Sequence, residues 1–363
     1  MTVKNVFLQV NTSGCLTNCI HCWAQSKPFE NMQLSDAEEI LMKAQEYFED
    51  KPEYHLWPFP MFEELAHPDA VEQIKLFRKY GQPPEEVATS GIALAIRDDW
   101  KDVLDGLKLL EVPFMVLSFH GIGATHDRAV GRKGAFEELL TALKRIRSAG
   151  IDIQINVFIT KENISEIPEL IKNVIAPDGV HENILISFAR YNATSRGRRY
   201  EKIRADYEDV EKIGSVLSEY SGDEVPDKDK FMAEIRSLTE AELVKQALSL
   251  SEDEKKKYKP RYLNDIWFVA DRNFDLYTGK GNFLTTLHGN IRKNDFSFLM
   301  DKALSGDRFG TLHSCFSKDI SDIDITELAK KFGDPESRKI YQGGLNEIRN
   351  CWVDKAFTEY RRY

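Results

Sequence analysis

The first part of the chain alternates between short apolar segments and longer amphipathic ones. The apolar segments, which predict strands, are residues 3–10, 55–57, 87–88, 113–119, 151–160 and 184–188. A helix-like segment follows each strand, and the clearest one, residues 134–149, ends at Gly150 as a typical C-cap. This alternation predicts an α/β fold of parallel βαβ units with right-handed connections. Six such units are fewer than the eight that close a (β/α)8 barrel.

Three cysteines, Cys15, Cys19 and Cys22, lie in the loop after the first predicted strand, with the spacing C-x3-C-x2-C. Three thiolates on one short loop can hold three corners of a cubane iron–sulfur cluster and leave the fourth iron open. An open metal position is typical of a catalytic site. A zinc site is the alternative, with His21 as a further ligand, but the second C-x2-C pair common in zinc sites is missing.

Composition limits the function classes. The chain has 363 residues and suits one large α/β domain with a smaller one beside it. Its net charge of −10 argues against general affinity for nucleic acid, which depends on neutralising phosphates. No apolar run reaches the ~18 residues of a membrane-spanning helix. With 5 Cys and no apparent signal peptide, we expect a cytoplasmic protein without a disulfide framework.

The cysteine spacing resembles the signature of the radical S-adenosylmethionine (radical SAM) superfamily, and the resemblance covers roughly residues 1–220. It implies a TIM-like partial (β/α)6 barrel. It also implies a [4Fe–4S] cluster on the three cysteines, with S-adenosylmethionine (SAM) bound to the open iron through its amine and carboxylate. His21, at a position where the family often has an aromatic residue, and Trp23 would pack against the cluster and the adenine. A reductant such as flavodoxin or ferredoxin is the implied protein partner.

The resemblance places further cofactor-binding residues after the second and third strands. Where the family often has G-G-E-P, this chain has no glycine, and Glu63, then Glu64, are the candidates to hold the SAM ammonium. The alternative is that these glutamates favour the positive end of the next helix. The turn Thr89-Ser90-Gly91 resembles the family's T-N-G turn, so the Thr89 and Ser90 hydroxyls are candidates to contact SAM.

Polar residues also end or interrupt the last three strands. Ser118 and His120 resemble the family's S-x-D-G, with Ser118 a candidate for the SAM ribose or carboxylate. His120 titrates near neutral pH if unperturbed, so we expect it to bind an anionic substrate or move a proton, unless it only shapes the turn. Asn156 needs a partner, because burying it alone costs about 1–3 kcal/mol. Ser187 is a candidate for adenine, and Arg190 for the SAM carboxylate or an anionic substrate, although its basic loop can equally be solvated.

The rest of the chain differs in character. Residues 221–260 are charged and helix-permissive, which predicts a connector or a lid over the barrel mouth. Residues 261–363 open with a predicted β-hairpin and resemble the twitch or SPASM appendage of radical SAM enzymes. Only Cys315 and Cys351 remain there, too few for an auxiliary cluster unless other ligands complete it. Each is a candidate hydrogen donor or a small buried side chain.

The resemblance implies an enzyme that cleaves SAM reductively to a 5′-deoxyadenosyl radical, which abstracts hydrogen from a substrate. Without an auxiliary cluster, redox-neutral chemistry such as epimerisation or rearrangement is favoured. Because Cys15 comes so early, we expect no N-terminal peptide-binding domain, which favours a small-molecule biosynthetic substrate. The alternatives are a ribosomal-peptide-modifying enzyme and a non-catalytic iron–sulfur electron carrier.

Overall fold

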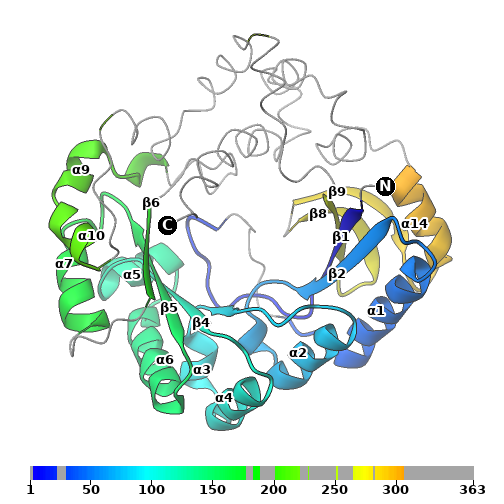
Figure 1. Cartoon of the computed structure of the whole chain (residues 1–363), viewed down its shortest axis with the longest axis horizontal. Helices are drawn as coiled ribbons and strands as arrows, with labels where there is room; N and C mark the ends of the chain where they lie inside the picture. Colours follow the sequence, from blue (N-terminus) through cyan, green and yellow to red (C-terminus); the bar gives the residue numbers. More distant parts are fainter. Residues whose placement is uncertain are drawn as a thin grey trace.

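The computed structural model describes residues 3–22, 30–176, 183–188, 201–220, 228, 251, 265–280 and 283–305. The strands form an open arc, and most helices cover its outer side (Figure 1). Trp23, Arg190, Cys315, Cys351 and nearly all of the predicted connector 221–260 lie outside the described residues. Within the described part, no helix combines the length and apolarity needed to cross a bilayer.

Strands and helices alternate through the first six strands, as the sequence predicts. The strands are β1 (Lys4–Val10), β2 (Tyr54–Pro60), β3 (Val87–Thr89), β4 (Met115–Phe119), β5 (Ile153–Ile159), β6 (Asn183–Phe188), β7 (Asp265–Ala270), β8 (Asp275–Lys280) and β9 (Phe283–Asn290). The longer helices are α1 (Leu34–Phe48), α2 (Ala70–Lys79), α4 (Trp100–Leu109), α6 (Ala135–Ala149) and α14 (Phe296–Ser305). The shorter helical segments are η1 (Glu64–Ala66), α3 (Ile92–Ile96), α5 (Ala124–Val130), α7 (Ile167–Glu169), η2 (Leu170–Ile175), η3 (Glu201–Ile203), α9 (Tyr207–Glu211) and α10 (Gly214–Tyr220).

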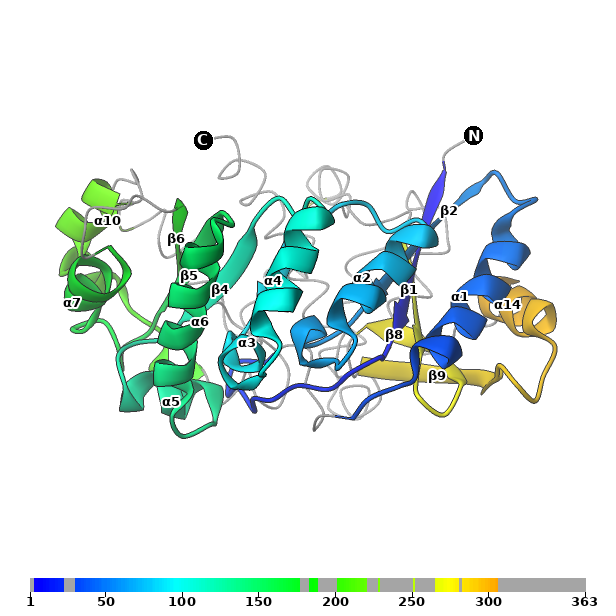
Figure 2. The same ribbon diagram turned by 90° about the horizontal axis from the view of Figure 1, so that it is seen from below.

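The first six strands belong to two sheets. Strands β3, β4, β5 and β6 form a four-stranded sheet in which neighbouring strands are parallel. Strands β1 and β2 pair in parallel in the other sheet, and no backbone ladder joins β2 to β3. The arc is therefore a partial barrel of the predicted type, with its hydrogen-bond ladder interrupted once. Helices α1, α2, α4 and α6 lie in a row along its outer surface (Figure 2).

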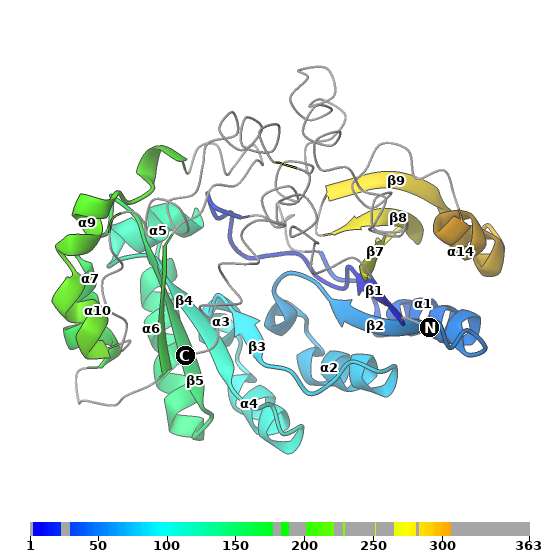
Figure 3. The ribbon, with the colours of Figure 1, turned by 45° about the horizontal axis from the view of Figure 1, so that its top comes forward.

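Strands from the C-terminal region extend the first sheet. β7 pairs in parallel with β1, and β8 and β9 continue in antiparallel order, so the sheet order is β2-β1-β7-β8-β9. The predicted hairpin is confirmed, and Asp271 shapes its turn because its Oδ1 accepts hydrogen bonds from the Asn273 and Asp275 amides. Figure 3 shows β7, β8 and β9 beside β1, with α14 next to α1. Strands β7 to β9, which follow the predicted division at residue 261, thus share one sheet with the N-terminal strands.

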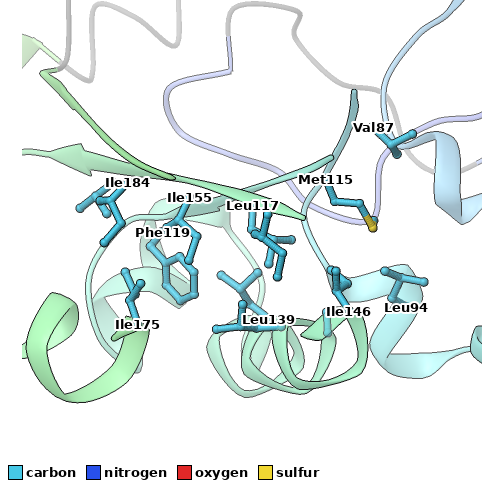
Figure 4. Close-up of a cluster of buried hydrophobic side chains, with 14 of the residues drawn as sticks. Val87, Leu94, Met115, Leu117, Phe119, Leu139, Ile146, Ile155, Ile175 and Ile184 are labelled. Carbon is cyan, nitrogen blue, oxygen red and sulfur yellow. The ribbon is translucent and has the colours of Figure 1, made fainter. Parts of the chain in front are cut away.

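In the described part of the chain, two large apolar cores lie between these sheets and the helices. The larger core joins the four-stranded sheet to α3, α4 and α6, where Leu117, Phe119 and Ile155 face Leu139 and Ile146 (Figure 4). The smaller core joins β1 and β7 to α1 and α14. Fully burying a side chain such as Leu139 contributes about 1.5–3 kcal/mol. Because strand residues alternate between faces, the residues between these core positions point into the arc.

Candidate active site

The three cysteines lie together on the loop between β1 and α1. Each cysteine is partly buried and none is in a disulfide. The buried Thr17 hydroxyl lies between two of the sulfurs, 3.1 Å from Cys15 Sγ and 3.4 Å from Cys19 Sγ. The sulfurs of Cys15 and Cys19 therefore lie close to each other, beside the same hydroxyl. A hydrogen bond from the Cys22 amide to the Cys19 carbonyl, 3.3 Å long, keeps the third cysteine on the same turn.

The surroundings of Cys15 and Cys19 disfavour an unpaired thiolate. Burial, and secondly the charge of Glu63, raises the pKa of Cys15 above its usual value of 9.0. Burial raises the pKa of Cys19 to about 12. Thiolates at these positions need the charge of a bound metal to be stable, because metal binding and deprotonation are coupled. Among the described side chains, no three His, Cys, Asp or Glu residues are grouped as ligands of a single metal ion.

The C-terminal end of α5 anchors the cysteine loop. The Asn18 and Ile20 amides donate to the Val130 and Ala129 carbonyls, at 2.9 and 3.0 Å. These carbonyls are two of those that a helix end leaves without helical partners. Gly131 follows with φ of +68°, and a Cβ there would be 2.6 Å from the Asn18 oxygen. Glycine is required because any side chain would push the cysteine loop off α5.

Glu63 connects the cysteine loop to the turn after β3. Its buried carboxylate accepts hydrogen bonds from the Thr89 hydroxyl at 2.5 Å, the Ser90 amide at 2.8 Å and the Ser90 hydroxyl at 2.6 Å. Its own amide donates to the Gly14 carbonyl at 3.3 Å, and its carbonyl accepts from Ser13 Oγ at 3.1 Å. Burial raises the pKa of Glu63, and the three donors partly oppose that shift. Glu63, Thr89 and Ser90, which the sequence picked out separately, thus form one network.

Glu64 lies outside this network. It begins the short helical segment η1, and its side chain is partly buried. Burial, followed by the charges of Glu63, Glu85 and Glu86, raises the pKa of Glu64 to about 8. The preceding Phe62 has φ of +75°, a left-handed conformation that costs a non-glycine residue about 1–2 kcal/mol. This strained residue stands where the family pattern has glycine.

The polar residues of β4 and β5 share the inner face of the arc. Ser118 and Asn156 are register partners on these parallel strands, and both are partly exposed. Asn156 Oδ1 accepts a hydrogen bond of 3.1 Å from Gln154 Nε2, so the predicted partner of Asn156 is a neighbour on its own strand. Ser187 lies on β6, where its backbone is the register partner of Phe158.

His120 belongs to a cluster of rings at the ends of β4 and β5. Its ring centroid is 4.3 Å from that of His21 and 5.0 Å from that of Phe158, which is nearly parallel to it. The His120 amide donates to Nδ1 of His126 at 3.2 Å. Burial, with the charges of His21 and His126, holds the pKa of His120 well below its usual value. The expectation of a histidine that titrates near neutral pH is therefore wrong, because the ring is uncharged there.

A second group of rings crosses the inner face of the other sheet. Phe7 of β1 is the register partner of Trp57 on β2 and of Trp267 on β7. The Phe7 and Trp267 rings are stacked with centroids 4.3 Å apart, and Trp57 is stacked on the other side at 6.3 Å. All three side chains are half-buried. They lie on the face of β1 opposite the core with α1, which contains Val6 and Leu8.

Several residues that shape the site were not singled out from the sequence. Thr17, His126 and Phe158 contact predicted residues, yet their side-chain types are common in ordinary turns and cores. His126 had the best signal, because it lies only six residues after the predicted His120. Glu166 carried no signal in the sequence. Its carboxylate accepts from the Ile122 amide and the Thr125 hydroxyl, both at 2.7 Å, and holds the loop that follows β4.

Comparison with known proteins agrees with this geometry. The sequence model of the Radical SAM superfamily matches residues 11–174, which include the cysteine loop and the ends of β2 to β5. The matched segment is somewhat less than half of the chain, and it identifies a radical SAM domain. Such a domain implies a [4Fe–4S] cluster and SAM. The three thiols on one loop fit the cluster, and the raised pKa values of Cys15 and Cys19 agree with thiolates that are stabilised by bound metal.

Two relatives match about half of this chain, and a third matches about a third of it. The AdoMet-dependent heme synthase of Methanosarcina barkeri is 29% identical over 210 residues, 55% of this chain and 54% of that protein. The Fe-coproporphyrin III synthase of the same organism is 24% identical over 208 residues, 56% and 47% of the two chains. The PqqA peptide cyclase of Gluconobacter oxydans is 32% identical over 109 residues, 30% and 29%. The chain thus spans about half the length of the first two relatives.

Proposed function

We propose that this protein is an enzyme that cleaves SAM reductively and removes a hydrogen atom from a small-molecule biosynthetic substrate. One observation carries the proposal: Glu63 joins the two segments, because its backbone is bonded to the cysteine loop and its buried carboxylate to the turn after β3. When bound, the cluster and SAM supply one-electron cleavage of a carbon–sulfur bond and a 5′-deoxyadenosyl radical that accepts the hydrogen. The protein's residues bind and orient these groups and exclude water.

Glu63 is suited to hold the SAM ammonium beside the cysteine loop. Its Oε2 accepts two hydrogen bonds from Ser90, while Oε1 accepts one from Thr89. A carboxylate can accept about four such bonds, so Oε1 keeps capacity for an ammonium proton. An ammonium also offsets the cost of burying this charge. Thr89 and Ser90 then orient the carboxylate, and Glu64 has no direct part.

The other candidate residues have secondary roles in this proposal. Ser118 and Asn156 share a face and a register, which suits them to the SAM ribose or carboxylate. Ser187, on the next strand, is the candidate for adenine. Arg190 is proposed for an anionic group, and Cys315 or Cys351 for returning a hydrogen atom to the substrate. Redox-neutral chemistry and a cytoplasmic location stay predictions.

For the substrate, we favour a flat tetrapyrrole. Two of the relatives are named as synthases of heme and of Fe-coproporphyrin III. The half-buried row formed by Phe7, Trp57 and Trp267 offers the aromatic surface on which a planar conjugated ring packs. The similarity to the PqqA peptide cyclase supports a peptide as the second candidate.

Product analysis tests the activity directly. The protein is reconstituted anaerobically with iron and sulfide, and SAM and dithionite are added. We expect 5′-deoxyadenosine by chromatography, and none from Cys15→Ala, Cys19→Ala or Cys22→Ala. A brown protein that forms no 5′-deoxyadenosine under any condition would instead be an electron carrier, and a colourless zinc-loaded protein would refute the cluster.

The same assay separates the two substrate classes. We expect iron coproporphyrin III to stimulate 5′-deoxyadenosine formation. Trp57→Ala should weaken that stimulation and leave the slow reaction without substrate unchanged. Stimulation by synthetic peptides alone would favour the peptide-modifying alternative. A flavodoxin that replaces dithionite would identify the class of reductant.

A further inference from the structure

Three rings from three separate segments meet behind the cysteine loop. His21 comes from the loop itself, His120 follows β4, and Phe158 lies on β5. Their centroids are 4.3 Å apart for His21 and His120, 5.0 Å for His120 and Phe158, and 5.8 Å for His21 and Phe158. His21 lies directly between Cys19 and Cys22 in sequence, so a shift of its ring moves the backbone that carries both sulfurs.

His120 is the most fixed member of this trio. Its side chain is only 5% exposed, and its amide is held at 3.2 Å by Nδ1 of His126. The His126 side chain is itself buried, with its ring centroid 5.9 Å from that of Phe136 in the core. No ring-nitrogen hydrogen bond of His120 occurs among the described residues, so its ring contributes through packing. The chain of contacts runs from the core, through His126 and His120, to His21.

We propose that His120 is a positioning residue for the cluster, acting through its ring on His21 and thereby on the angle at which Cys19 and Cys22 present their sulfurs. This inference rests on the proposed function, because it requires that the loop holds a cluster. Residues that orient metal ligands typically change metal affinity 10–100-fold when replaced. The uncharged state of the His120 ring agrees with a role in packing instead of charge.

Two substitutions distinguish the role of the His120 ring from the role of its nitrogens. His120→Leu removes the ring with little change in volume, and His120→Phe keeps a ring but no nitrogen. Both retain the amide that His126 holds. The reconstituted proteins are challenged with the chelator bathophenanthroline, and retained iron, the EPR spectrum of the reduced cluster and its midpoint potential are measured.

We expect His120→Leu to lose iron about 10-fold faster than wild type, with an altered EPR spectrum, and His120→Phe to restore both. His55→Ala is the matched control, because His55 is an exposed histidine whose ring contacts Trp57 instead of the loop. Thermal unfolding of the metal-free proteins checks folding. If His120→Leu does not fold, Phe158→Leu removes the other ring that contacts His21.

Two results would overturn the proposal. Wild-type iron retention and EPR in His120→Leu would show that the ring does not position the loop. An equal defect in His120→Phe would show that the nitrogens act, not the stacking. Failure of the proposed function is distinct, because the wild-type protein itself would then bind no cluster.

Discussion

The cysteine loop lies between two walls of opposite character. On one side, the ends of β2 and β3 supply Glu63, Thr89 and Ser90, which form a hydrogen-bonded network around a buried carboxylate and are here called the polar wall. On the other side, the ends of β4 and β5 supply His120 and Phe158, whose rings are stacked and uncharged and are here called the ring wall. Both walls follow from the same βαβ architecture, so their difference comes from the few residues that end each strand.

This difference assigns roles to the two sides of the site. A buried carboxylate with spare acceptor capacity favours a cationic group, because burial strengthens a charge–charge contact. Stacked neutral rings favour flat, weakly polar groups and hold neighbouring segments by shape. A molecule with an ammonium at one end and an aromatic base at the other would therefore match the two walls together, as the proposed binding of SAM requires.

The largest effect is expected from removing the cysteines of the loop that lies between the two walls. Cys15→Ala, Cys19→Ala and Cys22→Ala should each abolish the iron–sulfur cluster, because a cubane cannot be held by two thiolates from this loop. Iron and sulfide content and the visible absorption of the reconstituted protein measure the loss. Cys315→Ala and Cys351→Ala are matched controls, and a loss of the same cluster in either of them would contradict the assignment.

The next largest effect is expected on SAM affinity, from a substitution in the polar wall. Glu63→Gln removes the charge and places an amide donor against the Ser90 amide, so SAM affinity should fall about 10–100-fold, the value of a charge-assisted hydrogen bond. Glu64→Gln should change it less than about 3-fold, because Glu64 is outside the network. Equilibrium binding of SAM to the reconstituted Glu63→Gln and Glu64→Gln proteins measures the two changes in affinity. Equal losses in both variants would remove the special role of Glu63.

The residues of the polar wall were predicted from the sequence, whereas only His120 of the ring wall was. Glu63, Thr89 and Ser90 follow predicted strands, and the carboxyl ends of parallel strands gather at one edge. Phe158 carried no such signal, because an aromatic residue inside a strand is usually a core residue. The charge state of His120 depends on burial by segments distant in the chain, which a residue pattern does not contain.

The prediction of the fold from the sequence was limited in the same way. Periodicity located β1 to β6, because each strand and helix is long enough to show its own pattern. The short helices α3 and α5 were missed, since five to seven residues span fewer than two turns. The parallel pairing of β7 with β1 was also missed, because it joins residues more than 250 positions apart.

A pH-dependent prediction tests the electrostatics beside the polar wall. The folded pKa of Glu64, about 8, lies above its ordinary value of 4.5, so folding favours the protonated form. This contribution to stability is complete below about pH 4.5 and is lost as the pH rises through 8. Glu64→Gln should therefore be more stable than wild type by about 1–2 kcal/mol at pH 9, allowing for its partial exposure, and similar at pH 5.

Urea unfolding of both proteins between pH 5 and pH 9 measures this difference as a function of pH. Glu46→Gln is the control, because it removes a glutamate from an exposed position of α1. A constant difference between Glu64→Gln and wild type across this range would mean that Glu64 stays ionised in the folded protein.

The smallest effect concerns the strained residue that sets the start of the polar wall. Phe62, with φ of +75°, precedes Glu63, so its conformation directs the Glu63 amide to Gly14. Phe62→Gly and Phe62→Ala both remove the ring, but only glycine relieves the left-handed strain. The glycine variant should thus be the more stable of the two by about 1 kcal/mol, measured by urea unfolding. An alanine variant of equal or higher stability would show that this backbone relaxes without the ring, and that Phe62 holds Glu63 in place by packing instead.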